Sequence, residues 1–557
     1  MIRVENNKIY KPAVILFWIS VFVILFYFLQ TYYKYHFFYI EQNRLFLLNW
    51  AFIKDMLIYP GGFCRFVSGF LLQFYAYAYA GAFITTALST CIGLLIYRII
   101  TKITSVTIVP VLFLVPMVIS IFPHLDVNNY LEGTIAYILM LLSILACLKI
   151  TNYKYRFIFS IISVMVLFWL AGSIVSLFSV IILIHQLLTD FRHSYLYVIT
   201  VVCTAAIIYS SVLLSYTGSM RSTFLPDMYY HHLLPASPIL YWQWITTLFA
   251  IFFACLLRPV RKKPSNIVHI LLIILQIVAA LVVWRVCLIK YGNYKSIAYK
   301  KIDYLVRNEQ WDKIIDENKG KITNALLLCN LNMALANKNE LAEKMFQFDQ
   351  KGIGGLLINW DYTQQTAYLL SDLYFTTGNI AASQQIAFEG YVISESGNPR
   401  LLKRLVQTNL IMGSYAVAEK YIKLLEQTLY YRDWAKKHRK FLYNDNAVES
   451  DPLLGMKRKS VLSKDYLYNS VNIVEELTDL AENNPGYTVP IQYLGAIYLL
   501  AKDLVPFKKM LDKYYGTDVL PHLPQSFQEA VLLMSGNNAD MPSTKYEHTY
   551  WFYYFFK

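Results

Sequence analysis

Long apolar runs occupy the first half of the chain. A helix needs roughly 20 apolar residues to cross a bilayer, and most of these runs approach that length. The pattern predicts nine spans, at residues 13–31, 68–97, 104–122, 133–149, 157–171, 173–189, 194–215, 239–257 and 266–289. The interval 157–189 is ambiguous, because Ala171-Gly172-Ser173 either separates two short spans or lies inside one long tilted span.

The second half of the chain has shorter helical patterns that repeat. Gly378 recurs 35 residues later as Gly413, and a small residue follows each glycine by five positions, at Ser383 and Ala418. This spacing resembles the tetratricopeptide repeat, whose period is about 34 residues. A generic solenoid of helical hairpins is the alternative. Either stack presents a concave binding surface rather than catalytic groups.

These two patterns predict an all-α protein with two domains. Residues 1–290 are expected to form a polytopic transmembrane helix bundle, with the N-terminus inside and a long first outer loop at 32–67. Residues 291–557 are expected to form a soluble, tetratricopeptide-like α-helical repeat domain. The composition agrees, since 57% of residues are hydrophobic and 15% are charged, whereas about a quarter are charged in soluble globular proteins.

The charge of the chain is divided unevenly between these domains. Residues 1–290 carry 20 basic and 7 acidic residues, and residues 291–557 carry 30 and 29. The net charge of +14 therefore belongs mainly to the apolar half, which favours a membrane rather than a nucleic acid as the partner.

The position of the basic residues predicts the orientation of the spans. In the nine-span arrangement the inner segments carry 13 basic and two acidic residues, and the outer loops carry five of each. Because cytoplasmic loops are enriched in Lys and Arg, this bias places the N-terminus inside and the C-terminal domain outside the cytoplasm. A single span across 157–189 would change the parity and remove the bias from the later loops.

The first outer loop contains the acid that most invites a catalytic interpretation. Residues 46–57 are apolar and aromatic and predict a helix in the membrane interface. Glu41 follows three aromatic residues and Ile40, a setting that suits a carboxylate acting as a general base. Arg44, one turn further on, is a candidate for substrate binding, since it could steady Glu41 or bind a phosphate. The alternative is that Glu41 merely pairs with Arg44, as on an ordinary helix surface.

Two other outer loops hold candidate binding residues. His124 and Asp126 alternate in a short loop, so they could bind a divalent metal ion together, and the alternative is a solvated turn. Arg221, His231 and His232 lie in a later polar loop and are candidates for substrate binding. For the two histidines the alternative is a packed loop. The seven cysteines include no CxxC pair, so they predict neither a thiolate zinc site nor a disulfide framework.

The order of these features resembles that of the GT-C superfamily. Its members are membrane glycosyltransferases that use polyprenyl-phosphate-linked sugars. The resemblance rests on a first span, a long outer loop with an acid near its start, an interfacial helix, a Pro-Gly turn and further spans. It implies a catalytic acid at Glu41 and an acid–histidine motif at His124 and Asp126. The chain departs from the superfamily in two ways. Gln42, rather than a second acid, follows Glu41, and the nine predicted spans are fewer than the superfamily usually has.

The resemblance leads to a functional hypothesis. The protein would be a glycosyltransferase of a bacterial inner membrane, with Glu41 and Asp126 as its catalytic acids. It would transfer a sugar from a polyprenyl phosphate to a protein or glycan acceptor at the repeat domain. A divalent metal ion or a basic side chain would neutralise the leaving phosphate.

Two other functions compete with this hypothesis. The first is a non-enzymatic, membrane-anchored repeat scaffold for cell-envelope assembly. The second is a transporter, which ranks lower because the ionisable residues within the predicted spans, Arg285, His185 and His269, lie near span ends.

Overall fold

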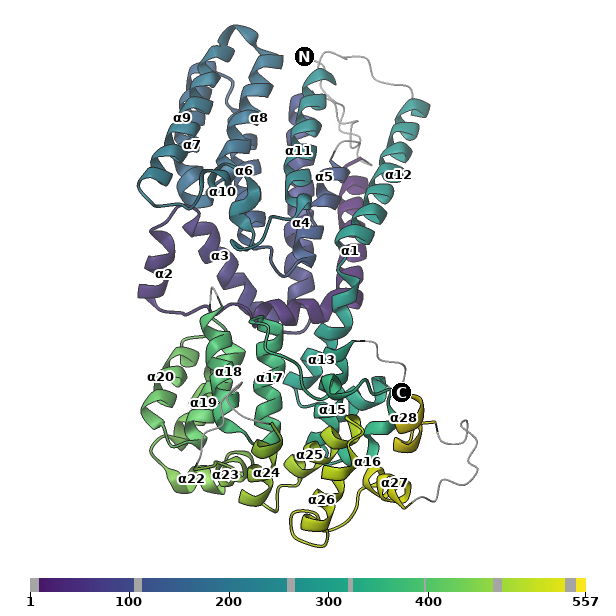
Figure 1. Ribbon diagram of the computed structural model, residues 1–557. Coiled ribbons are helices and arrows are strands. Elements are labelled where there is room, and N and C mark those ends of the chain that lie inside the picture. Colours follow the sequence, from purple (N-terminus) through teal and green to yellow (C-terminus); the bar gives the residue numbers. More distant parts are fainter. Residues whose placement is uncertain are drawn as a thin grey trace. The chain divides into compact units, whose positions relative to one another are not determined.

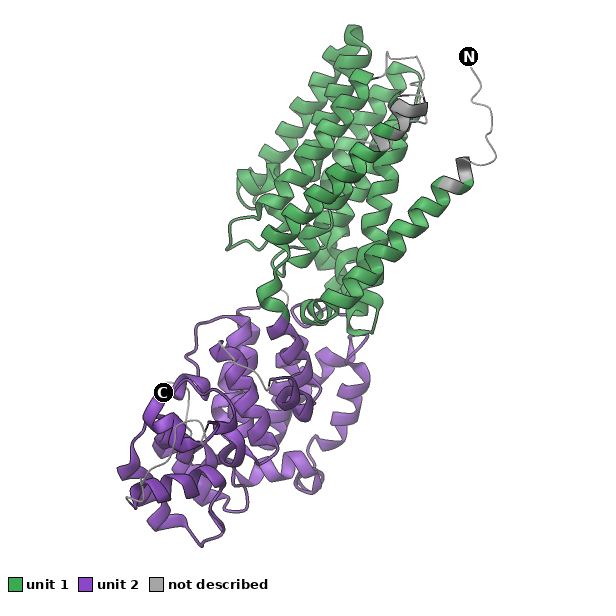
Figure 2. Cartoon of the chain, turned by 90° about the vertical axis from the view of Figure 1, so that its right-hand side faces the viewer, with its two compact units in different colours: residues 1–41, 48–297 green, residues 42–47, 298–557 purple. Residues whose placement is uncertain are grey.

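The chain folds into two compact units. The computed structural model describes residues 10–104, 113–257, 266–318, 324–394, 397–463, 473–535 and 547–557. Within these ranges the structure is all-α, without β-strands apart from two isolated bridges. Unit 1 comprises residues 1–41 and 48–297, and unit 2 comprises residues 42–47 and 298–557 (Figure 2). Six residues of the predicted first outer loop therefore belong to the C-terminal unit.

Unit 1 is a bundle of apolar helices (Figure 1). Its long helices are α1 (Tyr10–Glu41), α4 (Ala80–Thr104), α6 (Glu132–Lys149), α7 (Tyr153–Ala171), α9 (Ser194–Leu213), α11 (Pro238–Leu257) and α12 (Asn266–Tyr291). Its shorter elements are α2 (Trp50–Leu57), α3 (Gly62–Leu72), η1 (Gln73–Ala76), α5 (Leu114–Ile119), η3 (Phe122–Leu125), α8 (Ile174–Thr189), η4 (Phe191–His193), α10 (Met220–Phe224), η5 (Pro226–Tyr229) and η6 (Tyr294–Ser296). In the described part of the chain, seven helices are long and apolar enough to cross a membrane.

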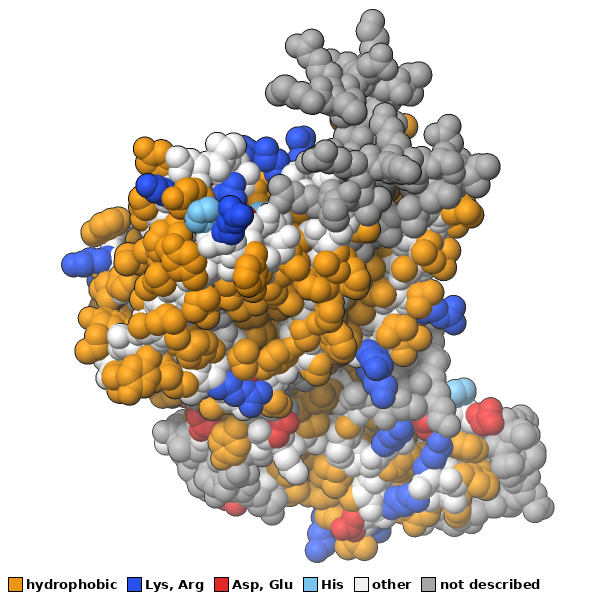
Figure 3. Space-filling model, turned by 90° about the horizontal axis from the view of Figure 1, so that it is seen from above, with side chains coloured by type: hydrophobic (Ala, Val, Ile, Leu, Met, Phe, Trp, Pro, Cys, Tyr) orange, Lys and Arg blue, Asp and Glu red, His pale blue; other side chains and the backbone are white. Residues whose placement is uncertain are grey.

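The outer surface of unit 1 suits a lipid environment. Large apolar side chains point outward from its helices, such as Ile24 on α1, which is 69% exposed, and Leu281 on α12, which is 62% exposed. Figure 3 shows hydrophobic side chains over much of one face of the molecule, with few charges among them. Contiguous apolar surface of this kind is rare in soluble monomers. The bundle is that of a multipass membrane protein.

Three predicted boundaries differ from the structure. Helix α1 continues through residues 32–41, which were expected to begin the outer loop, because Tyr33 and Phe37 extend its buried face. The predicted span 68–97 is interrupted before α4, where Tyr79 has a φ of +68°. The described part of the predicted span 104–122 is short, since residues 105–112 lie outside the described ranges.

The ambiguous interval 157–189 forms two helices, α7 and α8. Gly172 separates them with a φ of +78°, a left-handed conformation that glycine adopts without steric cost. Helix α8 has only 16 residues. It is shorter than the seven membrane-length helices, as is the apolar segment Leu114–Leu125.

Unit 2 is built from shorter helices. They are α13 (Ile297–Arg307), α14 (Trp311–Glu317), α15 (Ala325–Asn337), α16 (Leu341–Lys344), η7 (Met345–Gln347), η8 (Ile353–Gly355), α17 (Gln364–Thr377), α18 (Ile380–Val392), α19 (Pro399–Ile411), α20 (Tyr415–Glu426), α21 (Arg432–His438), η9 (Arg439–Phe441), α22 (Asp445–Ser450), α23 (Pro452–Lys459), α24 (Ile473–Asn483), α25 (Val489–Leu500), α26 (Leu504–Tyr514), α27 (Gln525–Met534) and α28 (Tyr550–Phe556).

Successive helices of unit 2 pack as hairpins. Helix α17 packs on α18, α18 on α19, and α19 on α20. The turns within the two hairpins contain Gly378 and Gly413, with φ of +94° and +75°. These are the two glycines that the repeat pattern singles out, and their left-handed backbone explains why glycine stands at both turns.

The segment 42–47 is part of the interior of unit 2. Gln42 is fully buried and donates a hydrogen bond to Asp303 (3.0 Å). Asn43 accepts a hydrogen bond from the hydroxyl group of Tyr368 (2.6 Å). Leu45, Phe46 and Leu47 are buried as well. The segment 42–47 is therefore a structural component of the C-terminal unit.

Candidate functional site

Glu41 lies at the last position of α1. Its side chain is only 4% exposed. The next residue, Gln42, already belongs to unit 2, as does Arg44, which is half-buried. The proposed base and the proposed phosphate-binding arginine therefore belong to different units, although only three positions separate them in the sequence.

His124 and Asp126 have separate hydrogen-bond partners. His124 is 6% exposed, and its Nε2 lies 3.2 Å from the hydroxyl group of Thr134. Asp126 is half-buried and accepts hydrogen bonds from the hydroxyl group of Tyr230 (2.8 Å) and the backbone N–H of Asn128 (3.0 Å). In the described ranges, no group of three or more His, Cys, Asp and Glu side chains could hold a metal ion.

The candidates from the later polar loop lie near the surface of unit 1. Arg221 is 70% exposed and forms a 3.1 Å ion pair with Asp227. The rings of His231 and His232 stack with centroids 5.3 Å apart. The backbone N–H of His231 donates to the carbonyl of Asn128 (3.0 Å). The structure thus brings the loop of Asp126 against the loop of His231, which the sequence pattern did not indicate.

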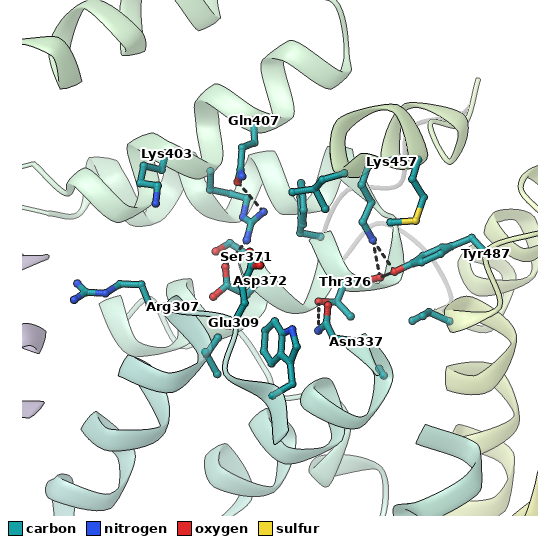
Figure 4. A pocket seen from close by; sticks show the side chains of 18 of the residues that line it. Arg307, Glu309, Asn337, Ser371, Asp372, Thr376, Lys403, Gln407, Lys457 and Tyr487 are labelled. Atoms are coloured by element: carbon teal, nitrogen blue, oxygen red, sulfur yellow. Dashed lines mark hydrogen bonds and ion pairs between the residues drawn. The ribbon is translucent and has the colours of Figure 1, made fainter. Parts of the chain in front are cut away.

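Unit 2 contains a cavity that combines charged and aromatic side chains. Its volume is about 430 Å³, and its walls come mainly from α13, the beginning of α14, α15, α17, α19, α23 and the beginning of α25. Its basic lining residues are Arg307, Arg400, Lys403, Arg404 and Lys457, and its acidic ones are Glu309 and Asp372. Its aromatic lining residues are Trp311, Phe375, Tyr431 and Tyr487. In Figure 4, Arg307 and Lys403 lie at one side, and Lys457 and Tyr487 at the other.

Asp372 joins two arginines at the centre of this cavity. One carboxylate oxygen accepts from Arg400 and the other from Arg404, each at 2.7 Å. Arg404 also donates to Gln407 (3.0 Å), and its guanidinium carbon lies 3.7 Å from the ring centroid of Phe375. These contacts hold the pKa of Asp372 below its usual value, against the opposing effect of burial. The carboxylate is therefore ionised and fixes both guanidinium groups.

The Nε atom of Arg404 is a buried donor without a partner. It is shielded from solvent and makes no hydrogen bond to any residue in the described ranges. A buried donor that is left unsatisfied costs about 1–3 kcal/mol. An acceptor entering the cavity could reduce this cost.

The surroundings of Lys403 disfavour the protonated, charged form of its side chain. Burial is the main reason that its pKa falls to about 8. The guanidinium groups of Arg307, Arg404 and Arg400 lower this pKa further. Glu309 acts in the opposite direction but does not offset them. An anion beside Lys403 would relieve this repulsion.

Lys457 is held at the other side of the cavity. Its ammonium group donates to the carbonyl of Thr376 (3.0 Å) and to the hydroxyl group of Tyr487 (2.6 Å). Burial, and then the charge of Arg404, lowers its pKa well below the usual value for lysine. Lys457 comes from residues 434–464, a stretch rich in Lys and Arg that largely folds into α21, α22 and α23.

The spacing of polar residues in the sequence indicates part of this site. Arg400, Lys403, Arg404 and Gln407 recur at the spacing of one helix face, and all four line the cavity. Lys457 and Arg307 are distant in the sequence, so only the packing of α13 and α23 brings them to that face.

The comparisons with known proteins identify a family but no activity. The model of a family of unknown function, DUF6057, matches residues 8–545. The chain therefore belongs to this family. No curated protein and no solved structure matches the chain.

Proposed function

We propose that this member of the DUF6057 family is a multipass membrane protein whose C-terminal unit binds an anionic ligand in the unit 2 cavity. The observation that carries the proposal is the convergence of five basic side chains, from three separate helices, on a cavity with two acidic lining residues. Its volume of about 430 Å³ falls in the range typical of small-molecule sites.

The charge balance of the cavity supports binding rather than a purely structural role. Asp372 pairs with Arg400 and Arg404, and Asp303 pairs with Arg400 as well, but the charge of Lys403 is still opposed by the guanidinium groups of Arg307, Arg404 and Arg400. Burying a charge without a counter-charge is unfavourable. A bound anion would supply that counter-charge and an acceptor for the Nε of Arg404.

The proposal includes the cellular setting expected from the sequence. The protein would lie in a bacterial inner membrane, with unit 2 outside the cytoplasm, where it serves the cell envelope. The positive-inside bias of the loops supports this orientation. The two hairpins with turns at Gly378 and Gly413 support a helical-repeat unit of the tetratricopeptide-like kind.

The test is anion binding by the full chain in detergent micelles. Isothermal titration with pyrophosphate and with citrate should detect binding of at least one of them. Lys403→Gln should weaken this binding about 10- to 100-fold, as expected for losing a hydrogen bond between charged groups. Lys420→Gln, at an exposed position of α20, is the matched control and should leave affinity unchanged. No binding of either anion, or equal binding by both variants, would refute the proposal.

Glycosyl transfer is the second candidate function. It is favoured by one observation: α1 ends at the buried Glu41, and two short helices, α2 and α3, precede the next long apolar helix. An acid followed by a short helix and then by further apolar helices is part of the order that the resemblance to membrane glycosyltransferases names, although the sequence predicted one short helix, at 46–57, rather than two. The donor would be a polyprenyl-phosphate-linked sugar, with a divalent metal ion or a basic side chain at the leaving phosphate.

A further inference from the structure

We infer that the ligand of the unit 2 cavity is an organic phosphate, a phosphoryl group attached to a ring. The phosphoryl group would lie among Arg307, Lys403 and Arg404, and the ring would lie along the aromatic part of the wall. This inference rests on the proposed function and specifies the chemistry of its ligand.

The arrangement of cations favours a phosphoryl group over a carboxylate. Lys403 has guanidinium groups near it from two different helices, with Arg307 on α13 and Arg404 on α19. A carboxylate offers two oxygens in one plane, whereas a phosphate monoester offers three acceptors and nearly two charges. The cavity already contains one such carboxylate, Asp372, whose two oxygens accept hydrogen bonds from Arg400 and Arg404. Arg307, Lys403 and Arg404 all line the cavity, so the three acceptors of a phosphoryl group can meet donors from both helices.

The rest of the wall favours a ligand larger than an inorganic anion. Trp311 and Tyr487 line the same cavity as the cations. Flat aromatic faces bind sugar or base rings through their apolar surfaces. A cavity of about 430 Å³ holds far more than one phosphate, so a ring joined to the phosphoryl group would use this additional surface.

The lining amides argue against an extended peptide as the ligand. Asn337 donates to the carbonyl of Met333 (2.9 Å) and to the hydroxyl group of Thr376 (3.1 Å). The side-chain amide oxygen of Asn339 accepts hydrogen bonds from the side chains of Thr488 and Gln492, each at 2.5 Å. These amides are engaged within the protein, so they do not offer the row of hydrogen-bonding groups that an extended peptide backbone would need.

The experiment compares four probes with the full chain in detergent by isothermal titration. Glucose 1-phosphate carries both the ring and the phosphoryl group. Glucuronate keeps a sugar ring but has a carboxylate, inorganic phosphate lacks the ring, and glucose lacks the charge. We expect glucose 1-phosphate to bind about tenfold or more tightly than each of the others, the difference made by one additional charge-assisted contact. Uridine 5′-monophosphate, run beside uridine, extends the comparison to a base ring.

Two variants assign the binding to this cavity. Lys403→Gln and Arg307→Gln should each weaken glucose 1-phosphate or uridine 5′-monophosphate binding about tenfold or more, and Lys420→Gln should not. Lys403→Gln removes a charge that burial opposes, so it is expected to fold, and its thermal unfolding midpoint verifies this.

The outcomes separate this inference from the proposed function. If glucuronate or inorganic phosphate binds as tightly as both organic phosphates, and Lys403→Gln weakens that binding, the inference is overturned. The proposed anion binding then still stands. If no anionic probe binds, or if the variants bind like the wild type, both conclusions are overturned.

Discussion

Gln42 accepts a hydrogen bond of 3.2 Å from the guanidinium group of Arg400, 358 positions further along the chain. Arg400 also donates to Asp372, whose other oxygen binds Arg404 in the unit 2 cavity. Gln42 directly follows Glu41, the last residue of α1. Gln42, which contacts the ion-pair network of the cavity, is thus joined by its peptide bond to the last residue of α1.

The first prediction concerns Gln42 itself. Gln42→Ala should lower the stability of unit 2 by about 1–3 kcal/mol, because Asp303 and Arg400 would each lose a buried hydrogen-bond partner. Thermal unfolding of the full chain in detergent measures the change. Gln528→Ala, on the exposed surface of α27, is the control and should have almost no effect. Equal unfolding midpoints for Gln42→Ala and the wild type would show that the segment 42–47 is not integral to unit 2.

The second prediction concerns Asp372. Asp372→Asn should destabilise unit 2 by about 3–5 kcal/mol, because it leaves Arg404 buried without its counter-charge and leaves Arg400 with Asp303 alone. Asp312→Asn breaks a 3.0 Å ion pair with Lys338, in which Asp312 is 75% exposed. This control should cost less than about 1 kcal/mol, as is usual for surface pairs. Similar losses in the two variants would contradict the picture of a buried network.

The third prediction is the pH dependence of anion binding. Lys403 has a pKa of about 8 in the unliganded protein, and a bound anion favours its protonated form. Affinity for an anion of constant charge should therefore fall by about tenfold between pH 7 and 9, as the ammonium group loses its proton. The neighbouring Arg307, Arg400 and Arg404 remain charged over this range. Titration with citrate, whose carboxylates are ionised throughout this range, measures the effect.

The same measurement on Lys403→Gln provides the control for this assignment. The variant should bind more weakly and lose most of the pH dependence above pH 7. Lys457, whose pKa is also lowered, would account for any dependence that remains. A wild-type affinity that stays constant from pH 7 to 9 would rule out Lys403 as the group responsible.

The fourth prediction tests glycosyl transfer. Glu41→Gln preserves size and hydrogen bonding but removes the basic oxygen, so transfer from a polyprenyl-phosphate sugar should fall roughly a hundredfold or more. Asp55→Asn, at an exposed position of α2, should retain activity. Membrane abundance and thermal stability of both variants are measured in parallel. Complementation of a deletion strain by Glu41→Gln, at wild-type level, would exclude Glu41 as the general base.

Local sequence patterns predicted much of the fold. Apolar runs identified the regions of α6, α7, α9, α11 and α12 to within a few residues, because a spanning helix satisfies its own backbone hydrogen bonds and needs only a continuous apolar surface. For the interval 157–189 the sequence left two alternatives open, and the structure has two helices there, separated by the left-handed backbone of Gly172. The extension of α1 through residue 41 was not visible, because it depends on what Tyr33 and Phe37 pack against.

The candidate site, like the fold, could be predicted only in part from the sequence. The sequence by itself determined that Arg400, Lys403 and Arg404 share one helix face, because helical periodicity alone places them there. Only the tertiary structure decided that Arg307 and Lys457 face the same cavity and that Gln42 contacts Arg400. These contacts join residues from about 50 to more than 350 positions apart, and they form only where separate helices bury their apolar faces together. No local pattern encodes that meeting, since it depends on the packing of the whole unit.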